Sequence, residues 1–540
     1  MALRNPLHYD TIAALFSAAA KAYPARPFIN TLSETAKAYQ IAAGEIRYSA
    51  LHAAVRDKQA AYAKAGYGPG HRVGILLENR PDVFVHWLAL NALGASMVPI
   101  NPELRAAELE YLISHSEMVL AIALPARQEE LRQAAAHGFT VIGSDDPIPG
   151  APHAANKQLV TQDTEAALLY TSGTTGLPKG CVLTNSYFLN CGEWYMTQGG
   201  YCAVYDTGER MITPLPLFHM NALACSAMVS MAIGGCVSYL DRFHPTSWWD
   251  SVKESKASII HYLGVMPAML IGAPSSPADR DHTVRFGFGA GVDGTLHAPF
   301  EERFGFPLVE AWAMNETGGG GAMIASGDPR HVGTHCFGTV GEKMEVRLIA
   351  DDGQDVEEGT QGELLVRSKG PDPRFGFFDR YLKNPDATNQ AWEDGWFHTG
   401  DIVRQNTDGT FVFIDRKKNV IRRSGENIAA VEVENALLSH NDIDTIAVAG
   451  TPDPVRGDEV FALVVATNPP VDPTKTAEDI LAYSLSRLAY YKAPGYIAFV
   501  DALPLTSTNK IKRGDLKALV ASLIDNPATQ DVRALKRRTK

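Results

Sequence analysis

Short apolar runs alternate with amphipathic stretches along the first third of the chain. Apolar residues from 12 to 22 and from 82 to 93 recur at helical spacing, with polar residues between them. The runs 72–77 and 95–100 are apolar at most positions, as in strands that are buried on both faces. Strands that alternate with helices at this spacing predict parallel α/β layers.

The alternation continues beyond residue 170. The most apolar stretch, 223–237, is interrupted by serines and glycines and is too short to span a membrane, so it predicts a buried helix. The β-rich runs 345–349 and 362–367 flank an Asp-Asp-Gly turn and predict a small β-subdomain. After residue 415 the pattern predicts helix 431–439, strands 443–448 and 460–466, and helix 476–488.

A chain of 540 residues is too long for a single hydrophobic core. We therefore predict an α/β protein whose large N-terminal multi-layer α/β domain, with the β-subdomain, covers residues 1–415. A small C-terminal α+β domain follows over residues 416–540. The end of the chain, 525–540, closes with Arg537-Arg538-Thr539-Lys540 and predicts a mobile basic tail.

Composition narrows the functional classes. A hydrophobic content of 45% and a charged content of 20% are ordinary for a soluble globular protein. The net charge of −12 disfavours nucleic acid as the main partner, although a local anion site is compatible with it. The 6 cysteines form no Cys-x-x-Cys pair and predict reduced, buried thiols. Neither a signal peptide nor a membrane span is recognisable, so we expect a cytoplasmic enzyme.

One stretch after a predicted buried strand is rich in phosphate-binding groups. Residues 171–180 read Thr-Ser-Gly-Thr-Thr-Gly-Leu-Pro-Lys-Gly. The glycines let backbone N–H groups turn toward one point, the hydroxyls donate hydrogen bonds, and Lys179 adds a mobile positive charge. The stretch is not a Walker A loop, because Leu177-Pro178 separates Gly176 from Lys179. On composition alone, an ordinary polar turn explains it equally well.

The order of the residues from Tyr170 to Gly180 is more specific than their composition. It resembles the phosphate-binding loop of the adenylate-forming superfamily, which includes acyl-CoA synthetases, luciferases and peptide-synthetase adenylation domains. Further motifs of the family follow in the family's order up to residue 513. The resemblance implies nucleotide-binding roles for Thr171, Ser172, Gly173, Thr174, Thr175, Gly176 and Lys179.

The string from Glu310 to Gly318 resembles the family's Tyr-Gly-x-Thr-Glu motif. The resemblance implies that Trp312 stacks on adenine, that Asn315 contacts the α-phosphate, and that Glu316 binds Mg²⁺ together with Thr171. Trp312, Ala313 and Asn315 stand where the family has Tyr, Gly and Thr. An indole stacks as well as a phenol, and an amide keeps donor and acceptor groups, so these departures are tolerable.

Three other segments are matched to the nucleotide through the same resemblance. Small residues at Gly289 and Ala290 would let the backbone run along the adenine and the acyl group. Asp401, in Gly-Trp-Phe-His-Thr-Gly-Asp, would accept hydrogen bonds from the ribose hydroxyls, although a turn-capping role is the alternative from the residues alone. Arg416 matches the family's second ribose ligand.

The C-terminal domain of the family is a mobile lid. By resemblance, Lys418 is the hinge around which this lid rotates, and Gly425 and Glu426 belong to the loop that lines the tunnel for CoA. Lys510 matches the catalytic lysine. Asn509 stands where the family has Gly, and asparagine is the next-best residue for a positive φ.

The acyl pocket is the least specified part of the site. His219 follows Pro-Leu-Phe, a context in which family members have a histidine at the acyl pocket, and we assign it to the catalytic residues with Glu316 and Lys510. From the residues alone, a hydrogen-bonded loop histidine is the better interpretation of His219. The predicted acyl-pocket residues are Trp194, His219, Val265, Met266 and Gly291.

The resemblance implies an ATP-dependent carboxylic acid–CoA ligase that works through an acyl-adenylate, with ATP, Mg²⁺ and CoA as cofactors or co-substrates. The string from Asp415 to Glu434 resembles acyl-CoA synthetases of the carnitine/crotonobetaine or medium-chain acid type. The partner is a small-molecule carboxylic acid, and a homodimer is compatible with the sequence. Two enzymatic alternatives are an adenylation enzyme that loads a carrier-protein thiol and a luciferase-like monooxygenase. A non-enzymatic alternative is a nucleotide-binding sensor, which the presence of both Glu316 and Lys510 disfavours.

Overall fold

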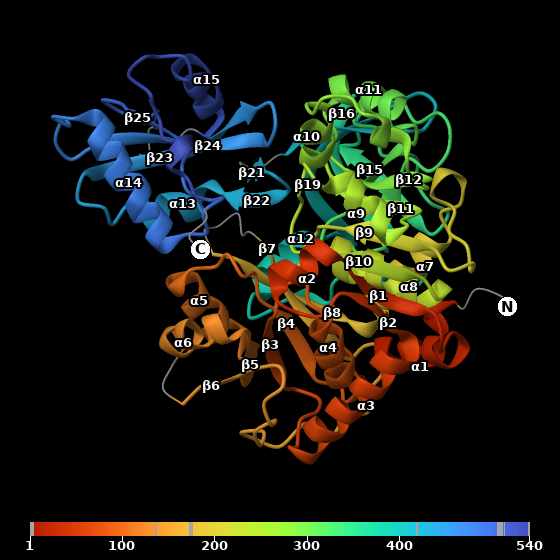
Figure 1. Cartoon of the computed structure of the whole chain (residues 1–540). Helices are drawn as coiled ribbons and strands as arrows, with labels where there is room; N and C mark the ends of the chain where they lie inside the picture. Colours follow the sequence, from red (N-terminus) through yellow and green to blue (C-terminus); the bar gives the residue numbers. More distant parts are fainter. Residues whose placement is uncertain are drawn as a thin grey trace.

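The computed structural model describes residues 5–135, 138–171, 177–350, 352–416, 420–504, 511 and 513–537. Most of the described chain forms a large body with three sheets, and the residues from 420 onward form a smaller body around a fourth sheet (Figure 1). The predicted fold class, a large N-terminal α/β domain with a β-subdomain and a small C-terminal α+β domain, is confirmed.

The first sheet contains the strands predicted from the early apolar runs. Its described strands follow the order β17-β8-β7-β4-β3-β5-β6. Those from β7 to β6 are parallel, whereas β8 runs antiparallel to β7, and β17 antiparallel to β8. Their bounds are β3 Arg72–Leu76, β4 Ser96–Pro99, β5 Leu120–Ala123, β6 Thr140–Ile142, β7 Glu165–Thr171, β8 Lys179–Thr184 and β17 Arg380–Tyr381.

The second sheet has the described strand order β14-β13-β12-β11-β9-β10-β1-β2. Its central strands are parallel, and the two edge strands, β14 and β2, are antiparallel to their neighbours. Their bounds are β1 Pro27–Thr31, β2 Gly44–Arg47, β9 Arg210–Thr213, β10 Cys236–Tyr239, β11 Ile259–Leu263, β12 Phe286–Ala290, β13 Leu308–Trp312 and β14 Met323–Ile324.

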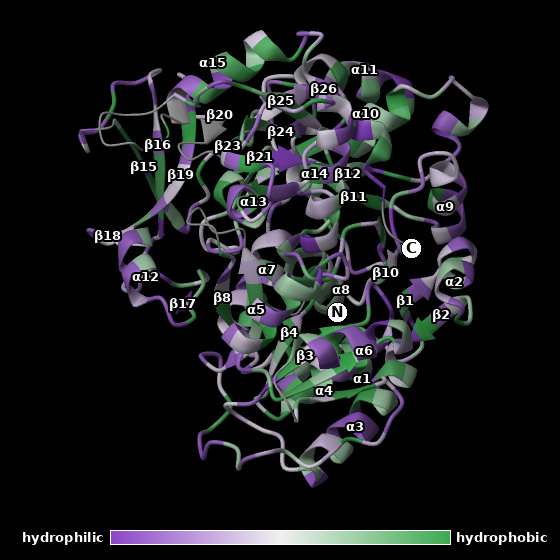
Figure 2. Cartoon of the chain, turned by 90° about the vertical axis from the view of Figure 1, so that its left-hand side faces the viewer, coloured by the Kyte–Doolittle hydropathy of each residue, from purple (hydrophilic) through white to green (hydrophobic). Residues whose placement is uncertain are grey.

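Helices cover both faces of these two sheets, which explains why the central strands are apolar throughout (Figure 2). The largest hydrophobic cluster joins both sheets through the helices packed between them, whereas separate clusters lie under the outer helices. The inner helices include α1 Ile12–Ala22, α4 Asp82–Ala92, α7 Asn185–Met196 and α8 Ala227–Ile233. The outer ones include α5 Ala106–Ser116, α6 Pro125–Ala134, α9 Trp248–Ser255, α10 Val265–Ile271 and α11 Gly294–Phe304. The remaining helices of this body are α2 Ser33–Tyr39, α3 Tyr48–Lys64 and α12 Pro385–Ala391.

The predicted buried helix at 223–233 is present but has an unexpected start. Asn221–Ser226 forms a π-helix, η3, and α8 continues from it. The Ser226 hydroxyl donates to the Asn221 carbonyl at 3.1 Å, across the wider π turn. Single π turns inside helices often mark functional sites, and η3 lies against the cavity described below.

The β-subdomain and the small domain are both built mainly from antiparallel pairs. The β-subdomain contains β15 Met344–Ile349, β16 Gln361–Ser368, β18 Trp392–Glu393, β19 Trp396–Gln405 and β20 Phe411–Arg416. The small-domain strands are β21 Val420–Arg423, β22 Glu426–Ala429, β23 Ile443–Asp453, β24 Gly457–Ala466, β25 Tyr496–Phe499 and β26 Gln530–Asp531. Its helices are α13 Ala430–Leu437, α14 Pro473–Arg487 and α15 Arg513–Leu523.

The described end of the chain is not the mobile basic tail that the sequence predicts. β26 pairs with β25, and the side chain of Lys536 is almost completely buried, with Nζ 2.6 Å from Oε1 of Glu459. Arg423 contacts the same carboxylate at 2.9 Å. A buried carboxylate needs cationic partners. Arg423 is the first partner of Glu459, and the end of the chain folds back to supply Lys536 as the second.

The cysteine prediction is confirmed: all 6 cysteines are buried and free. In the described part of the chain, none of the helices combines the length and the apolar character needed to cross a membrane.

Candidate active site

A cavity of about 1010 Å³ lies between the large body and the small domain. The β7–β8 hairpin, η3, β12 and the segment after β13 form its large-domain wall. The β21–β22 turn and α13 close it from the small domain. Its volume is at the upper end for ligand pockets, so it can hold a nucleotide and a second ligand.

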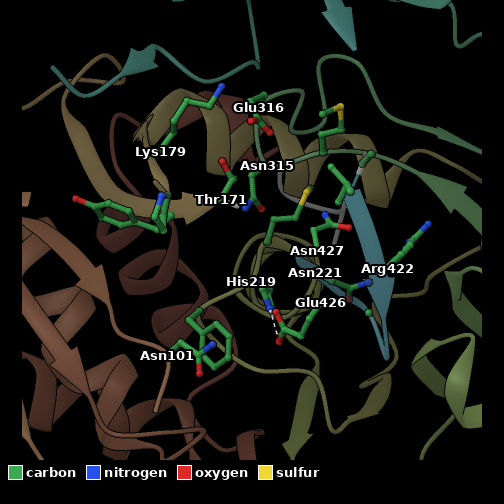
Figure 3. A pocket seen from close by; sticks show the side chains of 18 of the residues that line it. Asn101, Thr171, Lys179, His219, Asn221, Asn315, Glu316, Arg422, Glu426 and Asn427 are labelled. Atoms are coloured by element: carbon green, nitrogen blue, oxygen red, sulfur yellow. Dashed lines mark hydrogen bonds and ion pairs between the residues drawn. The ribbon is translucent and has the colours of Figure 1, made fainter. Parts of the chain in front are cut away.

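Most of the predicted site residues that the structure describes lie at this cavity. Figure 3 shows Thr171 and Asn315 between one end of the cavity, with Lys179 and Glu316, and another end, with His219 and Glu426. The predicted residues that line the cavity are Thr171, Lys179, Trp194, His219, Gly289, Ala290, Asn315, Glu316, Gly425 and Glu426.

Several predicted residues fall outside the described part of the chain. They are Ser172, Gly173, Thr174, Thr175, Gly176, Lys418 and Lys510. The structure describes the backbone of Arg416 but not its side chain. Arg416 ends β20, and its backbone is the register partner of Asp401 in β19.

The antiparallel pair of β7 and β8 forms the end of the cavity that contains Lys179. Thr171 and Lys179 are register partners at the open end of this pair, so both reach the same part of the cavity. Lys179 Nζ lies 4.1 Å from the centroid of the Tyr381 ring. A cation over an aromatic face is attracted by the ring quadrupole, so Tyr381 positions the lysine at the cavity wall.

Tyr381 is a site residue that the sequence did not reveal. It lies on β17 and lines the cavity, and its hydroxyl donates to Glu316 Oε1 at 2.8 Å. One tyrosine therefore contacts both Lys179 and Glu316. The sequence gives no local signal for Tyr381 as a site residue. β17 reaches the site through its pairing with β8, which lies about 200 residues earlier in the chain.

The donor atoms at this end fit Mg²⁺. Mg²⁺ prefers oxygen ligands and is usually held by one or two carboxylates together with substrate phosphates. Glu316 offers a carboxylate at the cavity and Thr171 a hydroxyl. Among the described residues, no group of three or more His, Cys, Asp or Glu side chains could hold a metal ion by itself. The site therefore fits an ion that binds together with nucleotide phosphates.

Trp312, the predicted adenine-stacking residue, makes a contact that the sequence did not reveal. Its side chain is buried and does not line the cavity, and its ring packs near Phe337, with centroids 6.0 Å apart. The indole N–H donates to Asp401 Oδ2 at 2.9 Å. Asp401 is also buried, while the preceding residues of β19, Thr399 and Gly400, line the cavity. The structure thus gives Trp312 a contact that positions Asp401, while its stacking on adenine stays a prediction.

This contact makes a testable prediction. Trp312→Phe keeps an aromatic ring but removes the donor to a charged group, an interaction worth about 1.5–3 kcal/mol. We expect the KM for ATP to rise by roughly tenfold or more, with little change in the KM for the acid. Discrimination between ATP and 2′-deoxy-ATP should also fall, because Asp401 is the predicted ribose ligand. Steady-state kinetics with both nucleotides provide the measurement, and a raised acid KM with an unchanged ATP KM would contradict the assignment.

His219 and the predicted CoA loop meet across the domain boundary. His219 Nε2 lies 3.2 Å from Oε1 of Glu426, which follows Gly425 in the β21–β22 turn. Gly425 has a φ of 87°, and an added Cβ would overlap with Cδ1 of Leu263, at the end of β11. The small domain therefore presents this turn to the large domain at very short range.

Three predicted acyl-pocket residues, Val265, Met266 and Gly291, do not line the cavity. Val265 and Met266 begin α10 and pack in the separate cluster beneath the outer helices of the second sheet. Gly291 follows β12 with a φ of 79° and is exposed. The residues found in place of the three are Cys191, Asn221, Cys225, Leu263 and Phe288.

A buried ion cluster joins the two bodies beside the cavity. Lys492 Nζ lies 2.6 Å from Oε1 of Glu108 in α5 and 2.6 Å from Oε1 of Glu432 in α13. The Ala489 N–H also donates to Glu108 Oε2 at 3.0 Å. Burial opposes the charge of Lys492, but the two carboxylates outweigh it and raise the pKa of the ammonium. Burial raises the pKa of Glu432, and the nearby carboxylate of Glu108 adds to this rise, while Lys492 opposes it.

Comparison with known proteins agrees with this geometry. The sequence pattern of the AMP-binding enzymes matches residues 16–371, and that of the AMP-binding enzyme C-terminal domain matches residues 432–510. The crotonobetaine/carnitine–CoA ligase of Salmonella paratyphi B is 29% identical over 508 residues, which are 90% of this chain and 96% of the relative.

Solved structures show the same fold. A malonyl-CoA ligase with methylmalonyl-CoA and AMP bound has a TM-score of 0.73 at 25% identity, over 89% of this chain and 96% of that one. The o-succinylbenzoate CoA synthetase of Bacillus subtilis has a TM-score of 0.80 at 24% identity, over 93% and 98% of the chains, as a double mutant with its product analogue OSB-NCoA. With the acyl-adenylate OSB-AMP, the same enzyme has a TM-score of 0.65 at 25% identity, over 93% and 97%.

The overall arrangement of this chain is thus more similar to the product-analogue complex than to the adenylate complex. The predicted resemblance is confirmed, because the family pattern covers more than half of the chain. This chain belongs to the AMP-binding enzyme family, the adenylate-forming superfamily.

Proposed function

We propose that this chain is an ATP-dependent carboxylic acid–CoA ligase that converts an acid, ATP and CoA to acyl-CoA, AMP and pyrophosphate. The proposal rests on one cavity in which the phosphate-side residues Lys179 and Glu316 meet the turn of Gly425 and Glu426. The similarity to crotonobetaine/carnitine–CoA ligase and to malonyl-CoA ligase supports CoA as the acceptor.

The first half-reaction makes the acid reactive. A carboxylate does not react with a thiol, because the leaving group would be oxide. An oxygen of the acid attacks the α-phosphorus of ATP, and the bond to the β-phosphate oxygen breaks and releases pyrophosphate. Lys179 and Lys510 stabilise the negative charge that accumulates on the phosphate oxygens. Mg²⁺ held by Glu316 and Thr171 supplies further charge neutralisation when it is bound.

The second half-reaction needs no nucleophile from the protein. The thiol of CoA loses its proton to water, its sulfur forms a bond to the acyl carbon, and AMP leaves with the electrons of the carbon–oxygen bond. Cys191 and Cys225 line the cavity, but burial raises the pKa of the Cys225 thiol to about 12. It therefore stays protonated near neutral pH and does not compete with CoA.

We further propose that residues 416–540 form a lid that alternates between two orientations around Lys418. In the structure, Gly425 and Glu426 face the cavity, whereas α15, which follows Lys510, lies on the side of the small domain away from β7 and β8 (Figure 1). The higher similarity to a product-analogue complex supports the same assignment. This orientation is the one proposed for thioester formation.

The test uses purified protein with ATP, Mg²⁺ and a panel of carboxylic acids, with and without CoA. We expect acid-dependent release of pyrophosphate and a CoA-dependent loss of free thiol. Acyl transfer to a phosphopantetheinyl carrier protein but not to CoA would support the carrier-loading alternative instead. Light emission with oxygen would indicate a luciferase-like enzyme, and the absence of pyrophosphate with every acid would contradict the proposal.

A further inference from the structure

The part of the cavity next to His219 has an uncharged wall. We call it the acyl wall and define it by Cys191 and Trp194 of α7, Asn221 and Cys225 of η3, and Phe288 of β12, all of which line the cavity. Trp194 and Phe288 meet edge to face, with ring centroids 6.3 Å apart. The acyl wall therefore presents aromatic rings, thiols and a single side-chain amide.

Contacts behind the acyl wall link the orientation of the Asn221 amide to the tautomer of His261. The Ser226 hydroxyl donates to the Asn221 carbonyl, so its oxygen is left to accept from Nδ1 of His261 at 2.8 Å. The same Nδ1 lies 2.8 Å from Asn221 Oδ1, and Nε2 lies 2.9 Å from the hydroxyl of Tyr195. With the proton on Nδ1, Asn221 Oδ1 accepts from the histidine, and its NH₂ group is left for a ligand.

The charged side chains around the acyl wall do not belong to it: Figure 3 shows Arg422 and Glu426 near Asn221, and both come from the small domain. Glu193, on α7 between Cys191 and Trp194, is buried and paired with Lys343 at 2.5 Å. Glu426 contacts His219 but belongs to the small domain. Burial lowers the pKa of His261 to about 3, so the imidazole behind the wall is neutral near pH 7. A charged acyl group would lose its hydration here without gaining a partner on the wall.

We propose that the acid activated by this enzyme has an uncharged acyl group with a hydrogen-bond acceptor, a carbonyl, ether or hydroxyl oxygen, that accepts from the Asn221 amide. This inference rests on the proposed function, because it names the substrate class of that site. It separates this chain from relatives whose names indicate charged substrates: carnitine has a fixed positive charge, and malonate has a second carboxylate.

The charge of the acyl group can be tested by binding, without turnover. The probes are two acylsulfamoyl-adenosines, in which a sulfamoyl group replaces the phosphate of the acyl-adenylate. One has a 5,5-dimethylhexanoyl group and the other has its isostere, 4-(trimethylammonio)butanoyl. By calorimetry, we expect the neutral probe to bind at least about tenfold more tightly, because the cation loses its hydration at an uncharged wall. Equal affinities, tighter binding of the cation, or no binding of either probe would overturn the proposal.

Asn221→Asp adds a charge with almost no change of shape. This variant should lower the ratio of neutral-probe affinity to cationic-probe affinity by about tenfold, because a carboxylate then faces the cation. The matched control is Asn435→Leu, which alters an asparagine of α13 that lines the same cavity away from the acyl wall. The ratio of the two affinities should be unchanged in this control. If Asn221→Asp also leaves the ratio of the two affinities unchanged, position 221 does not face the acyl group.

The acceptor is tested with probes that carry heptanoyl, 4-oxoheptanoyl, 5-oxoheptanoyl or 6-oxoheptanoyl groups. We expect one of the oxo probes to bind about tenfold more tightly than heptanoyl, the range for one net hydrogen bond. Asn221→Leu should abolish this difference while leaving heptanoyl binding close to normal. If no oxo probe is preferred, or if the preference survives in Asn221→Leu, the proposal is wrong.

The outcomes separate this inference from the proposed function. Probe binding as expected without pyrophosphate release from any acid would retain the acyl-wall assignment and reject the ligase. Pyrophosphate release with a preference for charged acids would retain the ligase and reject the substrate class. Thermal unfolding of each variant, with and without AMP, identifies a variant that has lost its fold rather than its selectivity.

Discussion

Replacing Lys510 with alanine is expected to lower the rate of acid-dependent pyrophosphate release by roughly 10²–10³, the range for losing one electrostatic contact in a transition state. The same variant, given synthetic acyl-AMP and CoA, should form thioester at close to the normal rate. The reason is that Lys510 belongs to the small domain, whereas its proposed partner, the α-phosphate, is bound by the large one. In the orientation seen here the turn of Gly425 faces the cavity instead.

The control for this split is Lys179→Ala. Lys179 and Glu316 both belong to the large domain and line the cavity. Their relative position therefore does not depend on the orientation of the small domain. The loss of Lys179 should thus slow adenylation without the same clean separation of the two half-reactions. Stopped assays of each half-reaction give the measurement. If Lys510→Ala slows both half-reactions equally, or slows neither, the two-orientation mechanism is contradicted.

Gly425→Ala should produce the opposite split. At a φ of 87° a side chain is strained, and its Cβ would overlap with Leu263 whenever the small domain takes the present orientation. We expect thioester formation from acyl-AMP to fall by about 10²-fold, the cost of a misplacement of about 1 Å. Pyrophosphate release should stay close to normal, because adenylation is proposed to use the other orientation.

Two further variants make this prediction sharp. Gly409→Ala imposes a similar strain at a φ of 83°, but an added Cβ there has nothing within 4 Å, so thioester formation should be unaffected. The double variant Gly425→Ala with Leu263→Ala removes the overlapping side chain and should recover part of the lost rate. If the double variant is no faster than Gly425→Ala alone, the close approach of Gly425 to Leu263 does not limit the reaction.

Periodicity and motif order predicted many elements of the fold and several of the residues that line the cavity. Helix α1 spans Ile12–Ala22, as the pattern of apolar residues indicates, because Ile12, Leu15, Phe16 and Ala19 face the core at helical spacing. Lys179 and Glu316 come from separate motifs, and the structure brings both to one cavity. Such features are local: a strand, a turn or a helix face is encoded within a short window.

The residues that the sequence missed depend on contacts between distant segments. Tyr381 joins the site through strand pairing, and Asn221 lines the cavity from the start of a π turn. Val265 is among the predicted acyl-pocket residues, yet it packs in the cluster beneath the outer helices of the second sheet. Lys536 looked like part of a basic tail, but a buried carboxylate far away in the sequence draws it inside. None of these placements follows from local periodicity.

The cluster of Lys492, Glu108 and Glu432 has a consequence for the energy cost of moving the lid. Lys492 and Glu432 both belong to the small domain, and only Glu108 belongs to the large one. When the domains separate, the lysine keeps one counterion, and the group released to water is a carboxylate, which hydrates well. The contact can thus open without leaving an unpaired cation in a buried place. Added salt should stabilise the released carboxylate and shift the lid away from the thioester-forming orientation, so ionic strength becomes a means of setting the balance between the two half-reactions.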